Sequence, residues 1–155
     1  MKRSTLILYP AAAIIIALTG AFIQATDQCD SKKLKDDAKA ALDPYTYDSG
    51  KVTRLYYKKK EALKEIEIPV FIGEKYKFVF NTSGLSRNVK ISVYNKDKES
   101  KNRKELFSFS STDGEKIKSY VPEGGKTHFY VDYALPAVSD SLPPAECAVL
   151  MLGYK

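Results

Sequence analysis

The spacing of apolar residues changes near residue 50, from a helical period to a strand-like one. In residues 30–43 the apolar side chains fall on one face at intervals of three and four residues: Leu34, Ala38, Ala41 and Leu42. Asp30 or Ser31 supplies an N-cap and Pro44 ends the segment. The pattern predicts one short helix over 30–43. Its apolar stripe is too weak to be stable alone, so we expect it to lie against a larger element.

After Val52 apolar and polar residues alternate with a period of two, which is typical of half-buried strands. The segments that alternate are 51–59, 64–72, 75–80, 88–94, 104–110, 116–121 and 127–133. The last segment, 147–154, is almost entirely apolar, which predicts that both of its faces are covered. Tyr76 and Tyr133 fall on the apolar faces of their segments, and we expect them in the core.

These segments predict a mainly β fold with antiparallel sheets. Gly, Asn, Asp and Ser occupy the breaks between the segments, as turns require. Seven or eight strands without a second helix exclude an alternating α/β fold. We expect a jelly-roll-like antiparallel β-sandwich with one N-terminal helix, and a closed barrel is the alternative. The charged segment 95–104 reads as a hairpin connection, and 134–146 as a crossover between sheets.

The N-terminus has the pattern of an export signal. Lys2 and Arg3 precede a run without charged side chains from residue 4 to residue 26, and small Ala25 suits a cleavage site. We therefore predict a signal peptide over 1–25 and a single mature domain over 26–155, secreted or periplasmic. The alternative is a retained membrane anchor formed by residues 5–25, because that run is about as long as the ~18–20 residues that span a bilayer.

Cys29 and Cys147 are the two cysteines of the chain. In an exported protein a disulfide is the default for such a pair. The bridge would close a loop of about 118 residues and contribute roughly 4–5 kcal/mol in the chain-entropy model. A lipid anchor at Cys29 is less favoured, because polar Asp27 and Gln28 precede it. Two cysteines and one histidine give no ligand-spaced metal motif, so we expect no metal and no cofactor.

The sequence contains no nucleophile, phosphate-loop or calcium-loop motif. The expectation is therefore a protein that is not an enzyme. Glu65 and Glu67 share one strand face, which keeps a small envelope hydrolase as an alternative. His128 and Asp132 also share a face, but four residues on a strand separate them by roughly 13 Å, too far for a catalytic dyad.

Tyrosines are the other candidate binding residues, since exposed aromatic rings can stack on sugars. The surface candidates are Tyr45, Tyr47, Tyr56, Tyr57 and Tyr130. A possible ligand patch combines Tyr56, His128, Tyr130 and Asp132, and a carbohydrate-binding module is the first alternative function. A solvent-exposed strand face with no binding role explains the same residues equally simply.

Charge does not favour nucleic acid as a partner. The chain has a formal net charge of +6. Removing Lys2 and Arg3 with the signal leaves 6 − 2 = +4, and basic and acidic residues are interleaved along the chain. We expect no nucleic-acid partner, and no membrane contact after signal cleavage. An envelope protein or a glycan is the expected partner.

The pattern "GEKYKFVFN…VKISVYNKD…ELFSFS…EGGKTHFYVDY" resembles small exported bacterial β-sandwich modules of the pre-peptidase C-terminal type, over about residues 66–133. The same residues and the terminal "LGYK" also resemble an uncharacterised family of small secreted proteins from gliding bacteria. The resemblance implies a non-catalytic accessory role in the bacterial envelope or outside the cell. We therefore expect an exported binding or structural protein.

Overall fold

The computed structural model describes residues 29–139 and 144–155. The predicted signal peptide, residues 1–25, lies outside the described residues, as does the proposed start of the mature chain. The elements are α1 (Ser31–Ala40), β1 (Thr46–Leu55), β2 (Ala62–Pro69), β3 (Tyr76–Asn81), β4 (Lys90–Tyr94), β5 (Glu105–Ser110), β6 (Ile117–Tyr120), β7 (His128–Leu135) and β8 (Glu146–Tyr154). All eight predicted strands are present, and the mainly β fold with one helix is confirmed.

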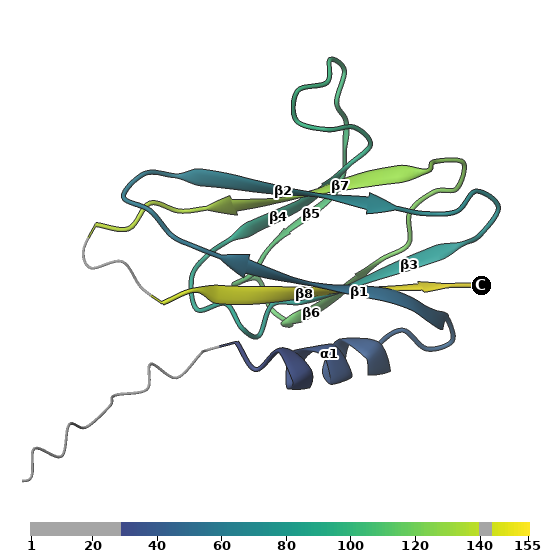
Figure 1. The fold of residues 1–155 in the computed structure, drawn as a ribbon, viewed down its shortest axis with the longest axis horizontal. Coiled ribbons are helices and arrows are strands. Elements are labelled where there is room, and N and C mark those ends of the chain that lie inside the picture. The colour runs from purple at the N-terminus through teal and green to yellow at the C-terminus, as the bar shows by residue number, and fades with distance from the viewer. Residues whose placement is uncertain (1–28, 140–143) are drawn as a thin grey trace, which may run out of the picture.

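The strands form two antiparallel sheets of four, which pack face to face as a sandwich (Figure 1). The first sheet has the order β1-β8-β3-β6 and the second β2-β7-β4-β5. This is the strand order of a jelly roll, in which consecutive strands lie in different sheets except β4 and β5, which are neighbours in the second sheet. The segment between β7 and β8 therefore crosses from one sheet to the other, as predicted. Strand β1 begins at Thr46, earlier than the sequence pattern indicated, because its first residues are polar and lie at a sheet edge.

The main core lies between the sheets and takes buried residues from every strand except the two edge strands β5 and β6. Phe107 and Phe109 of β5 and Tyr120 of β6 are partly buried and pack against it. Tyr76 and Tyr133 are both buried in it, as predicted. Phe78 contacts Phe129 of the opposite sheet edge to face, at a ring-centroid distance of 5.4 Å. Phe107 of β5 and Tyr120 of β6 stack at 4.9 Å and close the side where these two edge strands meet.

Helix α1 covers the outer face of the first sheet and makes a second, smaller core (Figure 1). On the helix side this core contains Leu34 and Ala38, together with Leu42 from the turn that follows α1. On the sheet side it contains Val79, Val149 and Met151. This cover explains why β8 is apolar on both faces: one faces the sandwich interior and the other faces α1. The helix is shorter than predicted. Asp30 caps it by accepting a hydrogen bond from the Lys33 backbone N–H at 3.1 Å.

A disulfide joins Cys29, just before α1, to Cys147 in β8, with the two Cα atoms 5.5 Å apart. The predicted pairing is confirmed. At the other end of the helix the Lys77 ammonium donates to the carbonyl of Ala41 at 2.7 Å and to that of Asp43 at 3.2 Å. Of the helices that can be described, none has the length and apolar character that a bilayer-spanning segment needs.

Candidate functional site

The outer face of the second sheet carries a row of polar side chains on the adjacent strands β2 and β7. The register places Glu65 opposite Asp132, Glu67 opposite Tyr130, and Pro69 opposite His128. The neighbouring residues Ile66 and Val131 point into the core, so alternation turns this set outward. The sequence pattern alone would leave this face in solvent.

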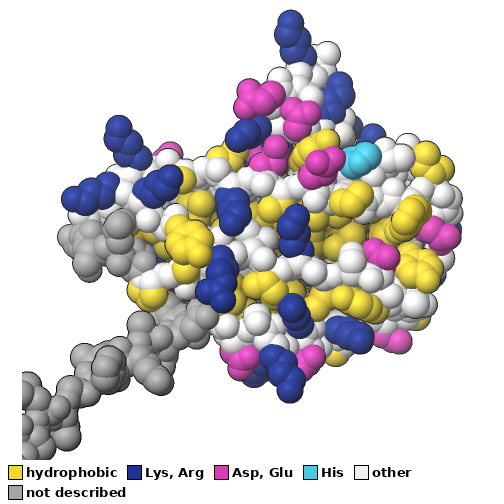
Figure 2. Space-filling model, viewed as in Figure 1, with side chains coloured by type: hydrophobic (Ala, Val, Ile, Leu, Met, Phe, Trp, Pro, Cys, Tyr) yellow, Lys and Arg dark blue, Asp and Glu magenta, His cyan; other side chains and the backbone are white. Residues whose placement is uncertain are grey.

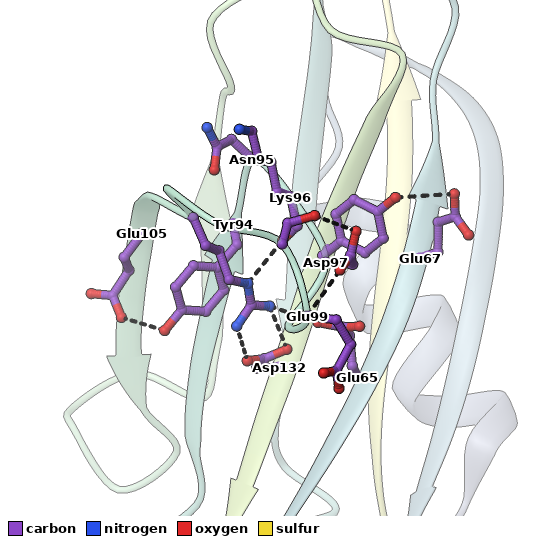
Figure 3. A network of polar contacts seen from close by, with 12 residues as sticks. Glu65, Glu67, Tyr94, Asn95, Lys96, Asp97, Glu99, Glu105 and Asp132 are labelled. Atoms are coloured by element: carbon purple, nitrogen blue, oxygen red, sulfur yellow. Dashed lines mark hydrogen bonds and ion pairs between the residues drawn. The ribbon is translucent and has the colours of Figure 1, made fainter.

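The connection between β4 and β5 folds over this face, above Asp132 and Glu65 (Figure 3). Its Arg103 bonds to both of these carboxylates. The guanidinium donates to both carboxylate oxygens of Asp132, at 2.8 and 2.9 Å, and to Glu65 at 2.7 Å. The Arg103 Nε donates to the carbonyl of Lys96 at 2.8 Å, and the guanidinium stacks 3.5 Å above the Tyr94 ring. Two carboxylates, a carbonyl and an aromatic ring therefore surround this cation. Bidentate pairing of this kind is both strong and geometrically specific.

The side chains in this cluster are shielded from water. The exposed fraction is 15% for Arg103 and 6% for Asp132. The hydrogen bonds to Asp132 raise the pKa of Arg103 more than burial lowers it. Burial and then the charge of Asp132 raise the pKa of Glu65, against the opposing effect of Arg103. Asp132 is thus the main partner of the cation, and Glu65 is the second.

The loop that carries Arg103 is ordered by its own hydrogen bonds. The Asp97 carboxylate accepts from the Ser100 hydroxyl at 2.7 Å and from the Glu99 backbone N–H at 2.9 Å. These bonds lower the pKa of Asp97, the Ser100 bond most of all. Asn95 accepts from the Lys104 backbone N–H at 2.7 Å and closes the base of the loop. The loop therefore presents a fixed edge to solvent.

A groove of about 450 Å³ lies between this loop, the end of β2 and the start of β7. Its side chains include Ile72, Asn95, Lys96, Lys126, His128 and Tyr130. The Tyr130 hydroxyl lies 3.4 Å from a Glu67 oxygen, and His128 Nε2 lies 3.5 Å from the same atom. Burial, followed by the charge of Glu67, raises the pKa of Tyr130. An aromatic ring, an aliphatic side chain and several donors and acceptors thus converge on one hollow.

The predicted ligand patch is only partly assembled. His128, Tyr130 and Asp132 share β7, but Tyr56 lies just after the end of β1. The Val138 backbone N–H, beyond the end of β7, donates to the carbonyl of Lys58. Tyr56 therefore lies near the end of β7 that is opposite His128. Asp132 is buried beneath Arg103, so the prediction of a purely solvent-exposed face was wrong at this residue. The sequence reasoning did not single out Arg103. Its place in a charged hairpin was visible, but no spacing rule relates it to two strands about 30 residues away on either side.

A second polar cluster surrounds Glu146 at the start of β8. This carboxylate is fully buried and accepts from the Tyr57 hydroxyl at 2.6 Å, the Ser86 backbone N–H at 3.2 Å, the Ser86 hydroxyl, and Arg87 at 2.7 Å. Burial raises the pKa of Glu146, but the bonds from Ser86 and Tyr57 outweigh burial and lower it. Four donors saturate the carboxylate, so it anchors the loop between β3 and β4. Tyr57 is buried here, which corrects its interpretation as a surface tyrosine.

Within residues 29–139 and 144–155, no group of three His, Cys, Asp or Glu residues is placed to hold a metal ion. No family model matches this chain, and neither does any curated protein. The resemblance to pre-peptidase C-terminal modules stays a prediction.

Proposed function

We propose that this chain is an exported, non-catalytic binding protein of the bacterial envelope or extracellular space, and that it binds its partner in the groove beside the 95–104 loop. The observation that carries the proposal is the clamp formed by Arg103, Asp132 and Glu65. It holds a charged loop in one conformation over a sheet face. A loop ordered before binding loses less conformational entropy when a partner arrives, which favours affinity.

The same clamp supports a role without catalysis. A glycosidase-type mechanism needs one carboxyl group free to deliver a proton and a second free to act as base or nucleophile. Asp132 and Glu65 instead share one guanidinium, and both lie beneath the loop. Export is supported by the Cys29–Cys147 disulfide, which fits an oxidising compartment.

A glycan is the partner that the groove lining favours most. The Tyr130 ring and the Ile72 side chain offer apolar contacts, and Asn95, Lys96 and His128 surround them with hydrogen-bonding groups. Sugar rings present apolar C–H faces between hydroxyl groups, so this mixture suits them. An envelope protein remains the alternative partner, and the test below distinguishes the two.

The test is site-specific photocrosslinking in the cells that export the protein. A photoreactive residue replaces Thr127 at the groove, and a matched control replaces Lys35 on the exposed side of α1. We expect adducts from the groove position that glycosidase treatment or protease treatment identifies as glycan or protein. Arg103→Gln should release the loop and reduce these adducts by several fold.

Equal adducts at both positions, or none at the groove, would contradict the binding site. Release of soluble products from envelope polysaccharide by the wild type, lost in Glu65→Gln, would contradict the non-catalytic assignment and favour the hydrolase.

A further inference from the structure

The excess positive charge of the chain is concentrated around the connection that crosses from β1 in the first sheet to β2 in the second. Residues 51–64 contain six Lys or Arg residues and one Glu, a net charge of 6 − 1 = +5, against +6 for the whole chain. The cations are Lys51, Arg54, Lys58, Lys59, Lys60 and Lys64. This stretch covers the second half of β1, the connection and the start of β2. The interleaving of charges in the rest of the chain concealed it, whereas Glu61 is the one acidic residue within this stretch.

The connection between β1 and β2 presents three consecutive lysines to solvent. Lys58, Lys59 and Lys60 are all exposed, and their ammonium groups make no hydrogen bond or ion pair with any residue that the structure describes. In Figure 2, Lys and Arg side chains gather at the left end of the molecule, where Figure 1 places this connection. These charges are therefore available to an external anionic partner.

Apolar side chains stand beside these lysines. Tyr56 is 62% exposed and Leu63 is 47% exposed, on the two sides of the connection. A tyrosine with an apolar ring and a wet hydroxyl is the kind of residue that settles at a bilayer interface. Lysines add attraction to anionic headgroups, and their aliphatic stems tolerate the apolar boundary.

The N-terminal apolar run joins the domain at this same end. Cys29 is bonded to Cys147, and Cys147 pairs with Arg54, four residues before Lys58. Residues 4–26, which carry no charged side chain, are separated from Cys29 only by Asp27 and Gln28. A membrane that holds this run during export, or afterwards if it is retained, is therefore connected through Cys29 to the end of the domain that carries the lysines.

We infer that the β1–β2 end, formed by Tyr56, Lys58, Lys59, Lys60 and Leu63, is a surface that binds an anionic lipid bilayer. The position of the charge revises the expectation of no membrane contact after cleavage. An acidic polysaccharide would also attract lysines, but it accounts for neither the exposed apolar pair nor the nearby N-terminal run. This surface lies beyond the opposite end of β7 from the His128 groove, so the inference does not depend on the proposed function.

Lysine footprinting tests this inference, and it works whether residues 5–25 are removed or retained. The protein, as processed by the exporting cell, is acylated with an amine reagent in the presence of lipid vesicles. One set of vesicles is neutral phosphatidylcholine, and the other contains about 30 mol% phosphatidylglycerol, enough for a negative surface potential. We expect several-fold slower modification of Lys58–Lys60 on the anionic vesicles only. Lys75, Lys98 and Lys126, on loops elsewhere, should be unaffected and serve as internal controls.

A matched pair of triple variants separates position from net charge. Lys58→Gln/Lys59→Gln/Lys60→Gln should weaken partitioning to anionic vesicles on the order of a hundred-fold, from roughly five-fold per lysine. Lys75→Gln/Lys98→Gln/Lys126→Gln removes the same charge and should weaken it far less. Equal losses in the two variants, equal protection by neutral and anionic vesicles, or protection of Lys58–Lys60 by dextran sulfate but not by anionic vesicles would each overturn the inference.

Discussion

The two outer faces of the sandwich are covered in different ways. On the first sheet, α1 and the turn after it bury Leu34, Ala38 and Leu42 against β3 and β8, and a disulfide fixes the start of the helix. On the second sheet, the 95–104 loop buries hardly any apolar surface and is held by Arg103 between Asp132 and Glu65. One cover is apolar and covalent, whereas the other is polar and electrostatic.

The difference teaches what each cover can do. Apolar packing tolerates small shifts, and a disulfide acts mainly on the unfolded chain, so the α1 cover stabilises the fold without specifying a surface. A bidentate guanidinium pair fixes orientation to a fraction of an ångström, but it depends on burial and on having every partner present. The loop cover is therefore suited to shaping a binding groove, and the helix cover is suited to stability.

The largest effect should come from breaking the covalent part of the helix cover. Cys29→Ala/Cys147→Ala should lower the free energy of unfolding by about 4–5 kcal/mol, because the unfolded chain regains the entropy of a loop closed across 118 residues. Chemical denaturation of both proteins at pH 7 measures it. Full reduction of the wild type is the control and should reproduce most of the loss. A change below about 1 kcal/mol would mean that α1 does not depend on the bridge.

A smaller effect should follow from breaking the loop cover. Arg103→Ala should cost about 2–4 kcal/mol, because it leaves Asp132 and Glu65 close together without their cation. Arg103→Lys keeps the charge but loses the bidentate geometry, so an intermediate loss is expected. Hydrogen exchange should rise in the 95–104 loop and not in α1.

A double-mutant cycle isolates this ion pair. The loss in Arg103→Ala combined with Asp132→Asn should be clearly smaller than the sum of the two single losses, because each single change leaves a buried group unpaired. Additive losses would show that the clamp contributes nothing beyond the packing of its members.

The smallest effects on stability should come from two buried tyrosines, Tyr57 and Tyr133. Tyr57→Phe removes one of the donors to buried Glu146 and should cost about 1–3 kcal/mol. Tyr133→Phe is the matched control: the Tyr133 hydroxyl, whose nearest polar neighbour is Thr53, has no hydrogen bond of normal geometry to a described residue, so its removal should change stability by less than about 1 kcal/mol. Thermal unfolding at pH 7 compares the two, and equal losses would contradict the assigned role of Tyr57.

The stability of the Tyr133→Phe variant should also differ from that of the wild type in its dependence on alkaline pH. Burial raises the pKa of Tyr133 to about 12, above its unfolded value of about 10. The folded state therefore favours the neutral phenol, and this contribution is complete below pH 10 and is lost as the pH rises through 12. Tyr133→Phe should show a shallower loss of stability between these pH values than the wild type.

The sequence by itself determined which segments form strands and a helix, and that the two cysteines pair. A period of two predicted eight strands, the apolar segment 147–154 predicted a doubly covered strand, and two cysteines in a chain with a predicted export signal predicted the bridge. The strand periodicity and the apolar run can be read from neighbouring residues, and the bridge follows from the number of cysteines in the chain. The helix ends and the early start of β1 at Thr46 were missed because capping and edge pairing depend on the neighbouring elements.

Only the tertiary structure decided which distant residues meet. Arg103, Asp132 and Glu65 come from three separate segments, and Tyr57, Ser86 and Glu146 from three others. The exposed lysines at 58–60 lie on the connection that crosses from the first sheet to the second. No local sequence period encodes these contacts, because they arise from how the jelly-roll crossovers bring distant strands together. The groove beside His128 and the lysine surface at the β1–β2 connection follow from that arrangement.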